Sequence, residues 1–238
     1  MNDDNTKISG VIHTFKRFNT KFRFFVTHSN DTVMSHHVSG VFYEEEELHL
    51  ISEFYTGGAI LDVGANVGNH SVFFSKVMGA DIVLPFEPNV MTRNVLLINL
   101  LLNECQNIDK QFCEIALGTH SCFLETVVES ENNLGGATLQ PSDTASIRCL
   151  RGDDIFAARA FSFIKIDVEG MELDVLEGLS ASIERWRPTM FVEVFDSRFP
   201  QFKAWCDNRD YEIVTNFKRY PEIDNYMVRH KTRISRSI

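Results

Sequence analysis

The chain contains 238 residues, of which 23 are Lys or Arg and 33 are Asp or Glu, so its formal net charge is −10. This length suits one sizeable α/β core and is short for two complete nucleotide-binding domains. The acidic balance has the wrong sign for a surface that neutralises phosphates, which argues against a nucleic-acid substrate.

The N-terminal part predicts a cap on the main core. Residues 8–43 alternate aromatic or β-branched side chains with polar ones in two runs, a pattern typical of β-hairpins. The acidic run Glu44–Glu47 precedes apolar residues at helical spacing, so a helix is expected there that ends before Gly57. Residues 1–55 would form this cap of hairpin and helix, and residues 56–238 the core of the same single domain.

From Ala59 onward, short apolar runs alternate with helical segments, which predicts an α/β fold with a parallel sheet. Seven core strands are expected, at 59–63, 81–86, 111–116, 162–167, 189–194, 210–215 and 225–230. Helices are expected near 68–78, 89–103, 171–178 and 198–208. Two further strand segments, 120–128 and 137–150, interrupt the alternation, with a polar turn at Glu129–Asn133 between them.

Compartment and solubility follow from the cysteines and from the apolar runs. Five cysteines without a C-x-x-C spacing argue against a zinc site and a complete disulfide framework, and they favour a reducing compartment. The polar segment Met1–Lys7 is unlike a secretory signal, and the apolar stretch Val95–Leu102 is far shorter than the roughly 20 residues of a membrane span. We therefore expect a cytoplasmic protein without an integral membrane segment.

The sharpest local signal is the turn that follows the first core strand. Asp62 ends the strand, and Gly64 and Gly68 let the backbone turn tightly and approach a ligand at the start of a helix. Asn66 stands between the two glycines and tolerates a left-handed conformation. A dinucleotide fingerprint requires G-x-G-x-x-G, so Asn66 weakens the alternative of a nicotinamide-dependent oxidoreductase. The charge of Asp62 suits a cofactor that bears an ammonium and a sulfonium.

Glu87 follows the second core strand, 87 − 62 = 25 positions after Asp62. In a doubly wound fold this position faces the ribose of an adenosine, where a carboxylate accepts hydrogen bonds from both hydroxyls. The carboxyl ends of adjacent strands form the binding edge of an open α/β sheet. We therefore expect Asp62 and Glu87 to hold one adenosine-containing cofactor together.

A third group of residues lies at the end of the strand expected at 162–167. Strand periodicity places Lys165 and Asp167 on one face, and Glu169 follows. A buried lysine needs a partner, so Lys165 either pairs structurally with a carboxylate or takes part in the site. Asp167 and Glu169 could form an Mg²⁺ site with Glu193 and Asp196. We assign no metal, because no spacing requires one.

Four segments in the chain resemble the FkbM-type methyltransferase family: Asp62–Ser71, Phe86–Asn89, Ala116–Gly118 and Ile164–Leu173. They occur in the family's order, over roughly residues 40 to 230, and the Ile-Asp-Val-Glu-Gly-x-Glu segment is the most specific. The resemblance implies the Rossmann-like class I methyltransferase sheet of seven strands, in the order 3-2-1-4-5-7-6. Its last strand would be antiparallel and would form a hairpin with the strand before it.

The resemblance also implies a role for each matched residue. S-adenosylmethionine would be the cofactor, and its methionine part would contact the first turn, at Asp62, Gly64, Asn66 and Gly68. Glu87 would hold the ribose. The adenine would be bordered by Ala116 and Leu117, after the third strand. Asp167 and Glu169 would lie beside the reacting centre.

Members of the family mostly methylate hydroxyl groups on sugars, glycans or secondary metabolites, so the resemblance implies an O-methyltransferase with a small-molecule or glycan acceptor. A protonated hydroxyl is a poor nucleophile, and a base is therefore expected. The candidates are Glu169, then His70 at the start of the helix beside the cofactor, then Asp167. A non-catalytic module that keeps the cofactor pocket remains an alternative.

Two positions depart from the family pattern. Pro85 lies inside an expected interior strand, where it removes one ladder hydrogen bond, so we expect the strand to end early or bulge there. Arg151-Gly152-Asp153 replaces the family's usual Thr-Leu-Asp turn, which leaves the role of Asp153 open.

Overall fold

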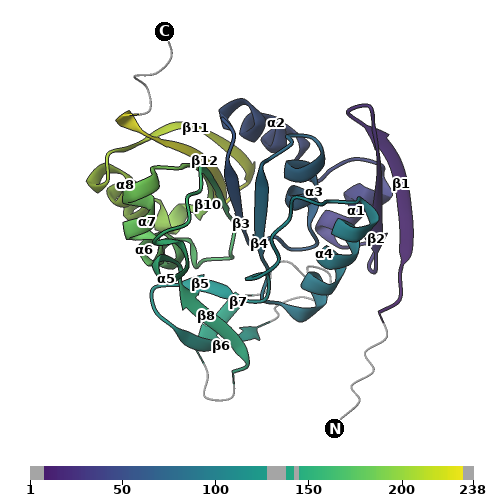
Figure 1. Cartoon of the computed structure of the whole chain (residues 1–238), viewed down its shortest axis with the longest axis horizontal. Helices are drawn as coiled ribbons and strands as arrows, with labels where there is room; N and C mark the ends of the chain where they lie inside the picture. The colour runs from purple at the N-terminus through teal and green to yellow at the C-terminus, as the bar shows by residue number, and fades with distance from the viewer. Residues whose placement is uncertain (1–7, 128–137, 142–144, 233–238) are drawn as a thin grey trace.

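The structure, a computed structural model, describes residues 8–127, 138–141 and 145–232 (Figure 1). Its main sheet has six strands in the order β11-β12-β10-β9-β3-β4. Their bounds are β3 (Ala59–Val63), β4 (Ile82–Phe86), β9 (Phe163–Ile166), β10 (Thr189–Phe195), β11 (Tyr211–Tyr220) and β12 (Ile223–His230). The pairs β3–β4, β3–β9 and β9–β10 are parallel, whereas β12 is antiparallel to both of its neighbours. The expected last hairpin is therefore confirmed.

The strand expected at 111–116 is wrong, and within the described residues the main sheet has six strands rather than seven. Residues 111–114 form turns, and the next strand, β5 (Ala116–Gly118), belongs to a second sheet. The six strands that do form keep the sequence 2-1-4-5-7-6 of the expected order.

Pro85 explains the interruption. Val83 N donates to Asn107 O at 2.8 Å and Glu87 N donates to Cys113 O at 2.8 Å, so this edge of β4 faces the segment that should have been the third strand. Pro85 lies between these two donors and has no N–H to offer. Hydrogen bonds between β4 and residues 107–113 therefore form only at the two ends of β4. On its other edge, β4 pairs with β3 over its whole length.

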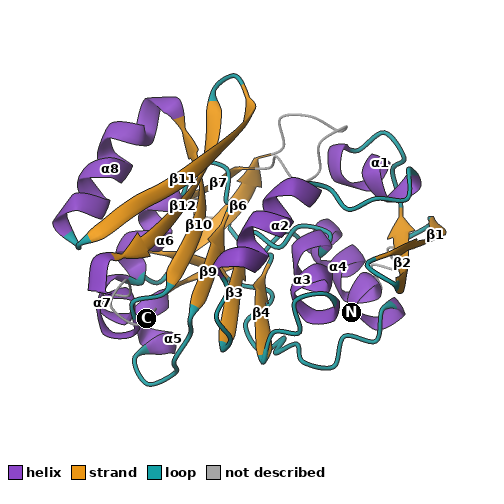
Figure 2. Cartoon of the chain, turned by 90° about the horizontal axis from the view of Figure 1, so that it is seen from above, coloured by secondary structure: helices purple, strands orange, loops and turns teal. Residues whose placement is uncertain are grey.

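Helices cover both faces of the main sheet (Figure 2). One side carries α5 (Gly152–Phe156), α6 (Glu172–Gly178), α7 (Ser180–Trp186) and α8 (Phe199–Asn208), and the other carries α2 (Glu45–Phe54), α3 (Asn69–Lys76) and α4 (Val90–Leu102). On β9, Ile164 and Ile166 pack with the first set, whereas Phe163 packs with the second. Lys165 shares the face of Phe163, as strand alternation predicts. No helix in these described ranges is long and apolar enough to span a bilayer.

A second sheet lies beside the carboxyl ends of the core strands, with the order β5-β8-β6-β7. It contains β6 (Cys122–Val127), β7 (Thr138–Pro141) and β8 (Ile147–Arg151) in addition to β5. The extra strands expected at 120–128 and 137–150 are thus found in part. The expected turn Glu129–Asn133 lies outside the described residues.

Asp153, whose role the sequence left undecided, has a structural role. Its carboxylate accepts hydrogen bonds from Ala181 N at 3.1 Å and Ser182 N at 2.8 Å, so it caps α7 from a distance of 28 residues in sequence. The α5 and α7 helices were not expected from the sequence, and this contact joins them. Arg151 also donates to Asp153, at 2.9 Å.

The N-terminal cap is a hairpin followed by two helices. A hairpin is present, as expected for the cap, but its strands β1 (Val11–Arg17) and β2 (Thr20–Val26) both lie within the first alternating run, so the two runs do not pair with each other. The second run was expected to be a strand and is instead α1 (Thr32–Val38). Asp31 decides this, because its side chain accepts from the N–H groups of Val33 and Met34 and starts the helix.

Asn99 within α4 and Asn103, the C-cap of this helix, attach the hairpin to the core. Asn99 Oδ1 accepts from Phe25 N at 2.7 Å, and Asn103 bonds both the N–H and the carbonyl of Arg23. Asn99 Nδ2 also donates to Val67 O, at 2.8 Å, within the glycine turn. The polar interruption in the apolar stretch of this helix therefore serves as the partner for the free edge of β2.

Candidate active site

A cavity of about 320 Å³ opens at the carboxyl ends of β3, β4, β9 and β10. One wall comes from the glycine turn and the end of β4, at Gly64, Asn66, Glu87, Pro88 and Asn89. A second wall comes from the ends of β9 and β10, at Asp167, Val168, Glu169 and Glu193. The cap and the β11–β12 hairpin supply Thr32, Val33, Tyr43, Glu44, Tyr220 and Ile223, and the second sheet supplies Thr126 and Leu139.

The glycine turn takes the shape that the sequence predicts. Gly64 and Asn66 have φ values of 81° and 49°, in the left-handed region. A Cβ on Gly64 would lie 1.7 Å from Asp167 O, so only glycine permits the ends of β3 and β9 to approach this closely. Gly68, with φ 87°, is the N-cap of α3 and lies below the cavity against Leu96, not among its lining residues.

Glu87 faces the cavity with both carboxylate oxygens held in place. Oε2 accepts from Asn66 N at 2.8 Å and Oε1 accepts from Asn89 N at 3.0 Å. Burial raises the pKa of Glu87, and its hydrogen bonds oppose that shift. The remaining lone pairs of this fixed carboxyl group can accept hydrogen bonds from two neighbouring hydroxyls.

Asp62 does not line the cavity, contrary to the expectation that it shares one cleft with Glu87. It is fully buried, and Ser71 Oγ donates to its Oδ2 at 2.5 Å. Burial raises the pKa of Asp62. Its other oxygen, Oδ1, lies 3.9 Å from Lys165 Nζ. Asp62 therefore acts on the site through Lys165, and direct contact with the cofactor remains only a prediction.

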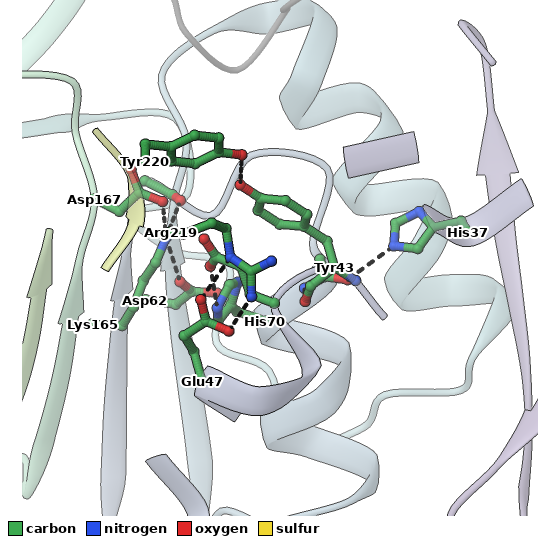
Figure 3. A network of polar contacts seen from close by, with 12 residues as sticks. His37, Tyr43, Glu47, Asp62, His70, Lys165, Asp167, Arg219 and Tyr220 are labelled. Atoms are coloured by element: carbon green, nitrogen blue, oxygen red, sulfur yellow. Dashed lines mark hydrogen bonds and ion pairs between the residues drawn. The ribbon is translucent and has the colours of Figure 1, made fainter. Parts of the chain in front are cut away.

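Lys165 connects the glycine turn to the second wall (Figure 3). Its Nζ donates to Gly64 O at 2.9 Å and to Asp167 Oδ2 at 3.0 Å. Burial opposes the lysine charge, but Asp167 and Asp62 outweigh it and raise the pKa of Lys165. The same pairing overcomes burial at Asp167 and lowers its pKa. The buried lysine thus has the carboxylate partners that the sequence required, and one of them faces the cavity.

Three carboxyl groups meet at the second wall. Ligand oxygens of Asp167, Glu169 and Glu193 lie within 4.8 Å of one another, close enough to hold a divalent cation. Asp196 is not in this group and instead pairs with Lys218 at 3.1 Å. Burial and the charge of Asp167 raise the pKa of Glu193 to about 11. Burial and Asp167 thus favour the protonated form of the Glu193 carboxyl, which is hydrogen-bonded to Asp167, and a metal at this site stays a prediction.

The structure separates three predicted residues from the cavity. His70 is buried in the first turn of α3, and its Nε2 lies 3.4 Å from Glu44 Oε2, so Glu44 stands between it and the cavity. Burial lowers the pKa of His70 to about 3, which makes it a weak base. Ala116 and Leu117 are buried in β5, and neither is among the lining residues. The second sheet reaches the cavity instead through Thr126 and Leu139.

The lining residues that were not expected as site residues include Tyr43, Glu44 and Tyr220. The two tyrosine hydroxyls are 2.9 Å apart and join the cap to β11 (Figure 3). Beside them, Arg219 Nε donates to the buried Glu47 at 2.7 Å. The sequence carries no signal for the tyrosine pair, because 177 residues separate them. The sequence indicated Glu44 only as one of the acidic residues at the start of a helix.

The family model for the methyltransferase FkbM domain matches residues 62–234. The chain belongs to the FkbM methyltransferase family. A relative named "Methyltransferase 1", from Beauveria bassiana (strain ARSEF 2860), is 21% identical over 207 residues, which cover 75% of this chain and 82% of the relative. Membership in a methyltransferase family decides against the nicotinamide-dependent oxidoreductase.

Solved structures agree on the fold of this FkbM-family methyltransferase. A methyltransferase FkbM from Methylobacillus flagellatus KT matches with a TM-score of 0.52 and 20% identity, over 82% of this chain and 52% of that one. A ribosomal protein L11 methylase from Lactobacillus delbrueckii subsp. bulgaricus matches with a TM-score of 0.50 and 14% identity, over 78% of each chain. TrmK from M. capricolum, solved with S-adenosylhomocysteine, has a TM-score of 0.50 and 11% identity, over 78% of this chain and 67% of that one. These matches show an α/β methyltransferase fold.

S-adenosylmethionine is the cofactor of this FkbM-family methyltransferase. The chemistry of the cavity fits it in two respects. The fixed carboxyl group of Glu87 suits the adjacent hydroxyls of a ribose, and the acids of the second wall suit a compound that bears an ammonium and a sulfonium. Gly64, Asn66 and Glu87 are the predicted contacts that face the cavity.

Proposed function

We propose that the protein is an O-methyltransferase that acts on a hydroxyl of a sugar, a glycan or a secondary metabolite. One observation supports this most strongly. The glycine turn with Glu87 and the carboxyl groups of Asp167 and Glu169 line one and the same cavity. A cofactor held by the glycine turn and Glu87 would have a carboxyl-rich, hydroxyl-binding surface beside it.

The cofactor supplies an electrophilic methyl group, and the protein must align an acceptor with it. Methyl transfer is an in-line displacement, so good positioning alone can remove about 7–11 kcal/mol of the barrier. The short loops after β3 and β9 give the walls this rigidity, since Lys165 ties Gly64 O to the Asp167 carboxylate. The charge on Asp167 is thereby fixed beside the reacting centre.

The acceptor side of the cavity suits a sugar-like compound. Tyr43 and Tyr220 present aromatic faces with polar tips, which pack on the C–H faces of a sugar and bond its hydroxyls. Glu169, with φ 52°, and Asp167 add carboxyl oxygens that accept hydrogen bonds from hydroxyls. The five thiols are free, in keeping with the reducing, cytoplasmic location that forms part of this proposal.

The test is release of S-adenosylhomocysteine during incubation with S-adenosylmethionine and a panel of methyl glycosides of glucose, rhamnose and fucose. We expect acceptor-dependent release and a methyl ether in the product by mass spectrometry. Release that does not depend on any hydroxyl compound would contradict O-methylation. Tight binding of S-adenosylhomocysteine by calorimetry without turnover on any acceptor would favour the non-catalytic module.

A further inference from the structure

Glu44 has a conformation that helix formation does not explain. It is the N-cap of α2, yet its φ and ψ are 56° and 41°, in the left-handed region, and its side chain makes no capping hydrogen bond. N-cap residues ordinarily have extended dihedrals and use their side chains as caps. A left-handed glutamate is strained, and such strain gathers at functional sites. Here it turns the carboxyl group toward the cavity, where the residue is 5% exposed.

His70 lies directly behind this carboxyl group. Its Nε2 is 3.4 Å from Glu44 Oε2 and has no hydrogen bond among the described residues. Because burial keeps the imidazole neutral, the contact involves no opposing charge on His70. The imidazole therefore limits where Glu44 can move but does not reach the cavity itself.

Charged and titratable groups face Glu44 from every element around it. They are His70 on α3, Lys165 and Asp167 at β9, Glu193 on β10, Glu47 on α2, Arg219 on β11, and the adjacent Tyr43. Burial is the largest influence and Asp167 the next, and together they raise the pKa of Glu44 to about 8. Lys165 and Arg219 oppose this shift. A carboxyl group in this range gains and loses a proton near neutral pH.

We propose that Glu44 is the group that accepts the proton from the acceptor hydroxyl, and that His70 is a positioning residue that holds its carboxyl group. This inference rests on the proposed O-methyltransferase function. The other carboxyl groups are less suited: Asp167 is paired with Lys165, and burial together with Asp167 favours the protonated form of Glu193. Glu169 is more exposed, and its place at the end of β9 suits binding of acceptor hydroxyls.

The step balances without a further reactant. The acceptor hydroxyl oxygen forms the new bond to the methyl carbon, while the bond between that carbon and sulfur breaks and its electron pair stays on sulfur. The hydroxyl proton goes to an Oε atom of Glu44. This proton leaves to solvent once product departs, and the carboxylate is restored.

The first experiment compares Glu44→Gln with Glu46→Gln on whichever methyl glycoside the wild type methylates. Glu46 is exposed and belongs to the same run of four glutamates, so it is a matched control. We expect Glu44→Gln to lower kcat about 10²- to 10³-fold and to remove the rise of kcat/KM through pH 8, while Glu46→Gln retains both. Glu169→Gln should lower kcat but keep the rise with pH.

His70 is tested by the same profile. Replacement by Phe should shift the midpoint of the rise and lower kcat, and Gln, whose amide nitrogen lies near the position of Nε2, should restore part of the loss.

A wild type that methylates no glycoside would overturn the proposed function. An active wild type whose Glu44→Gln variant keeps its rate and its pH profile would overturn the role of Glu44 alone.

A second measurement needs no acceptor or cofactor. Glu44 has an ordinary pKa of 4.5 and a folded value of about 8, so the folded state holds the extra proton between these values, and its stabilising effect is lost as pH rises through 8. Between about pH 6 and about pH 9, the urea midpoint of the wild type should therefore fall relative to that of Glu44→Gln. Glu46→Gln should follow the wild type. Equal pH dependence in all three proteins would contradict the proposal.

Discussion

The two sides of the cavity are built in different ways. The side that we propose for the cofactor consists of loops that directly follow core strands, and its residues Gly64, Asn66 and Glu87 lie within 24 positions of one another. The acceptor side joins segments far apart in the chain, such as Tyr43 and Tyr220, which meet only in the folded protein. The cofactor side is therefore fixed by local backbone geometry and the acceptor side by long-range packing. Substitutions should separate the two.

The largest effect is expected at Gly64. Replacing it with Ala places a Cβ 1.7 Å from Asp167 O at φ 81°, so the ends of β3 and β9 must separate. We expect a loss of at least about 3 kcal/mol in the free energy of unfolding, measured in urea. Gly79→Ala is the matched control, because Gly79 also has positive φ but nothing lies near its Cβ. Equal losses in both variants would show that dihedral strain alone is responsible.

Glu169→Gln should separate binding from turnover. The amide keeps the shape of the side chain and loses its charge at the reacting centre. We expect turnover to fall about 10²-fold while affinity for S-adenosylhomocysteine, measured by calorimetry, is unchanged. Unchanged turnover would remove Glu169 from the acceptor side.

Glu87→Gln should act on the cofactor side alone. The carboxyl group accepts from two backbone N–H groups and, in our proposal, from the ribose hydroxyls. An amide nitrogen in place of one oxygen loses an acceptor, so affinity for S-adenosylhomocysteine should fall about 10- to 100-fold. An effect on the acceptor KM without this loss would contradict the division into two sides.

The smallest effect is expected at the tyrosine pair. Tyr43→Phe and Tyr220→Phe each remove the 2.9 Å contact between the hydroxyls, which is worth about 1 kcal/mol. The acceptor KM should rise about fivefold in either variant, and the double variant should be no worse than the singles, because they share one interaction. Additive effects would show that the hydroxyls act separately. Affinity for S-adenosylhomocysteine is the control and should not change.

The sequence predicted the elements whose patterns are local. The glycine turn, the ends of β4 and β9, the first hairpin and the last hairpin all follow from spacing over a few residues. The seventh strand is missing because Pro85, which has no N–H, lies on the edge of β4 that this strand would pair with. The helix α1 forms because Asp31 caps it. Periodicity alone predicted neither outcome. Burial could not be read from the sequence either. Asp62 and His70 lie at the expected strand and helix positions, but they are buried behind Lys165 and Glu44 and do not line the cavity.

Asn99 has a consequence for any attempt to simplify this protein. Its side-chain amide accepts a hydrogen bond from Phe25 N and donates one to Val67 O. One side chain therefore joins the hairpin to the glycine turn. A shortened core without residues 1–26 would leave the side-chain oxygens of Asn99 and Asn103 without their N–H donors, next to the glycine turn. The N-terminal hairpin is thus linked to the shape of the glycine turn, even though none of its residues lines the cavity.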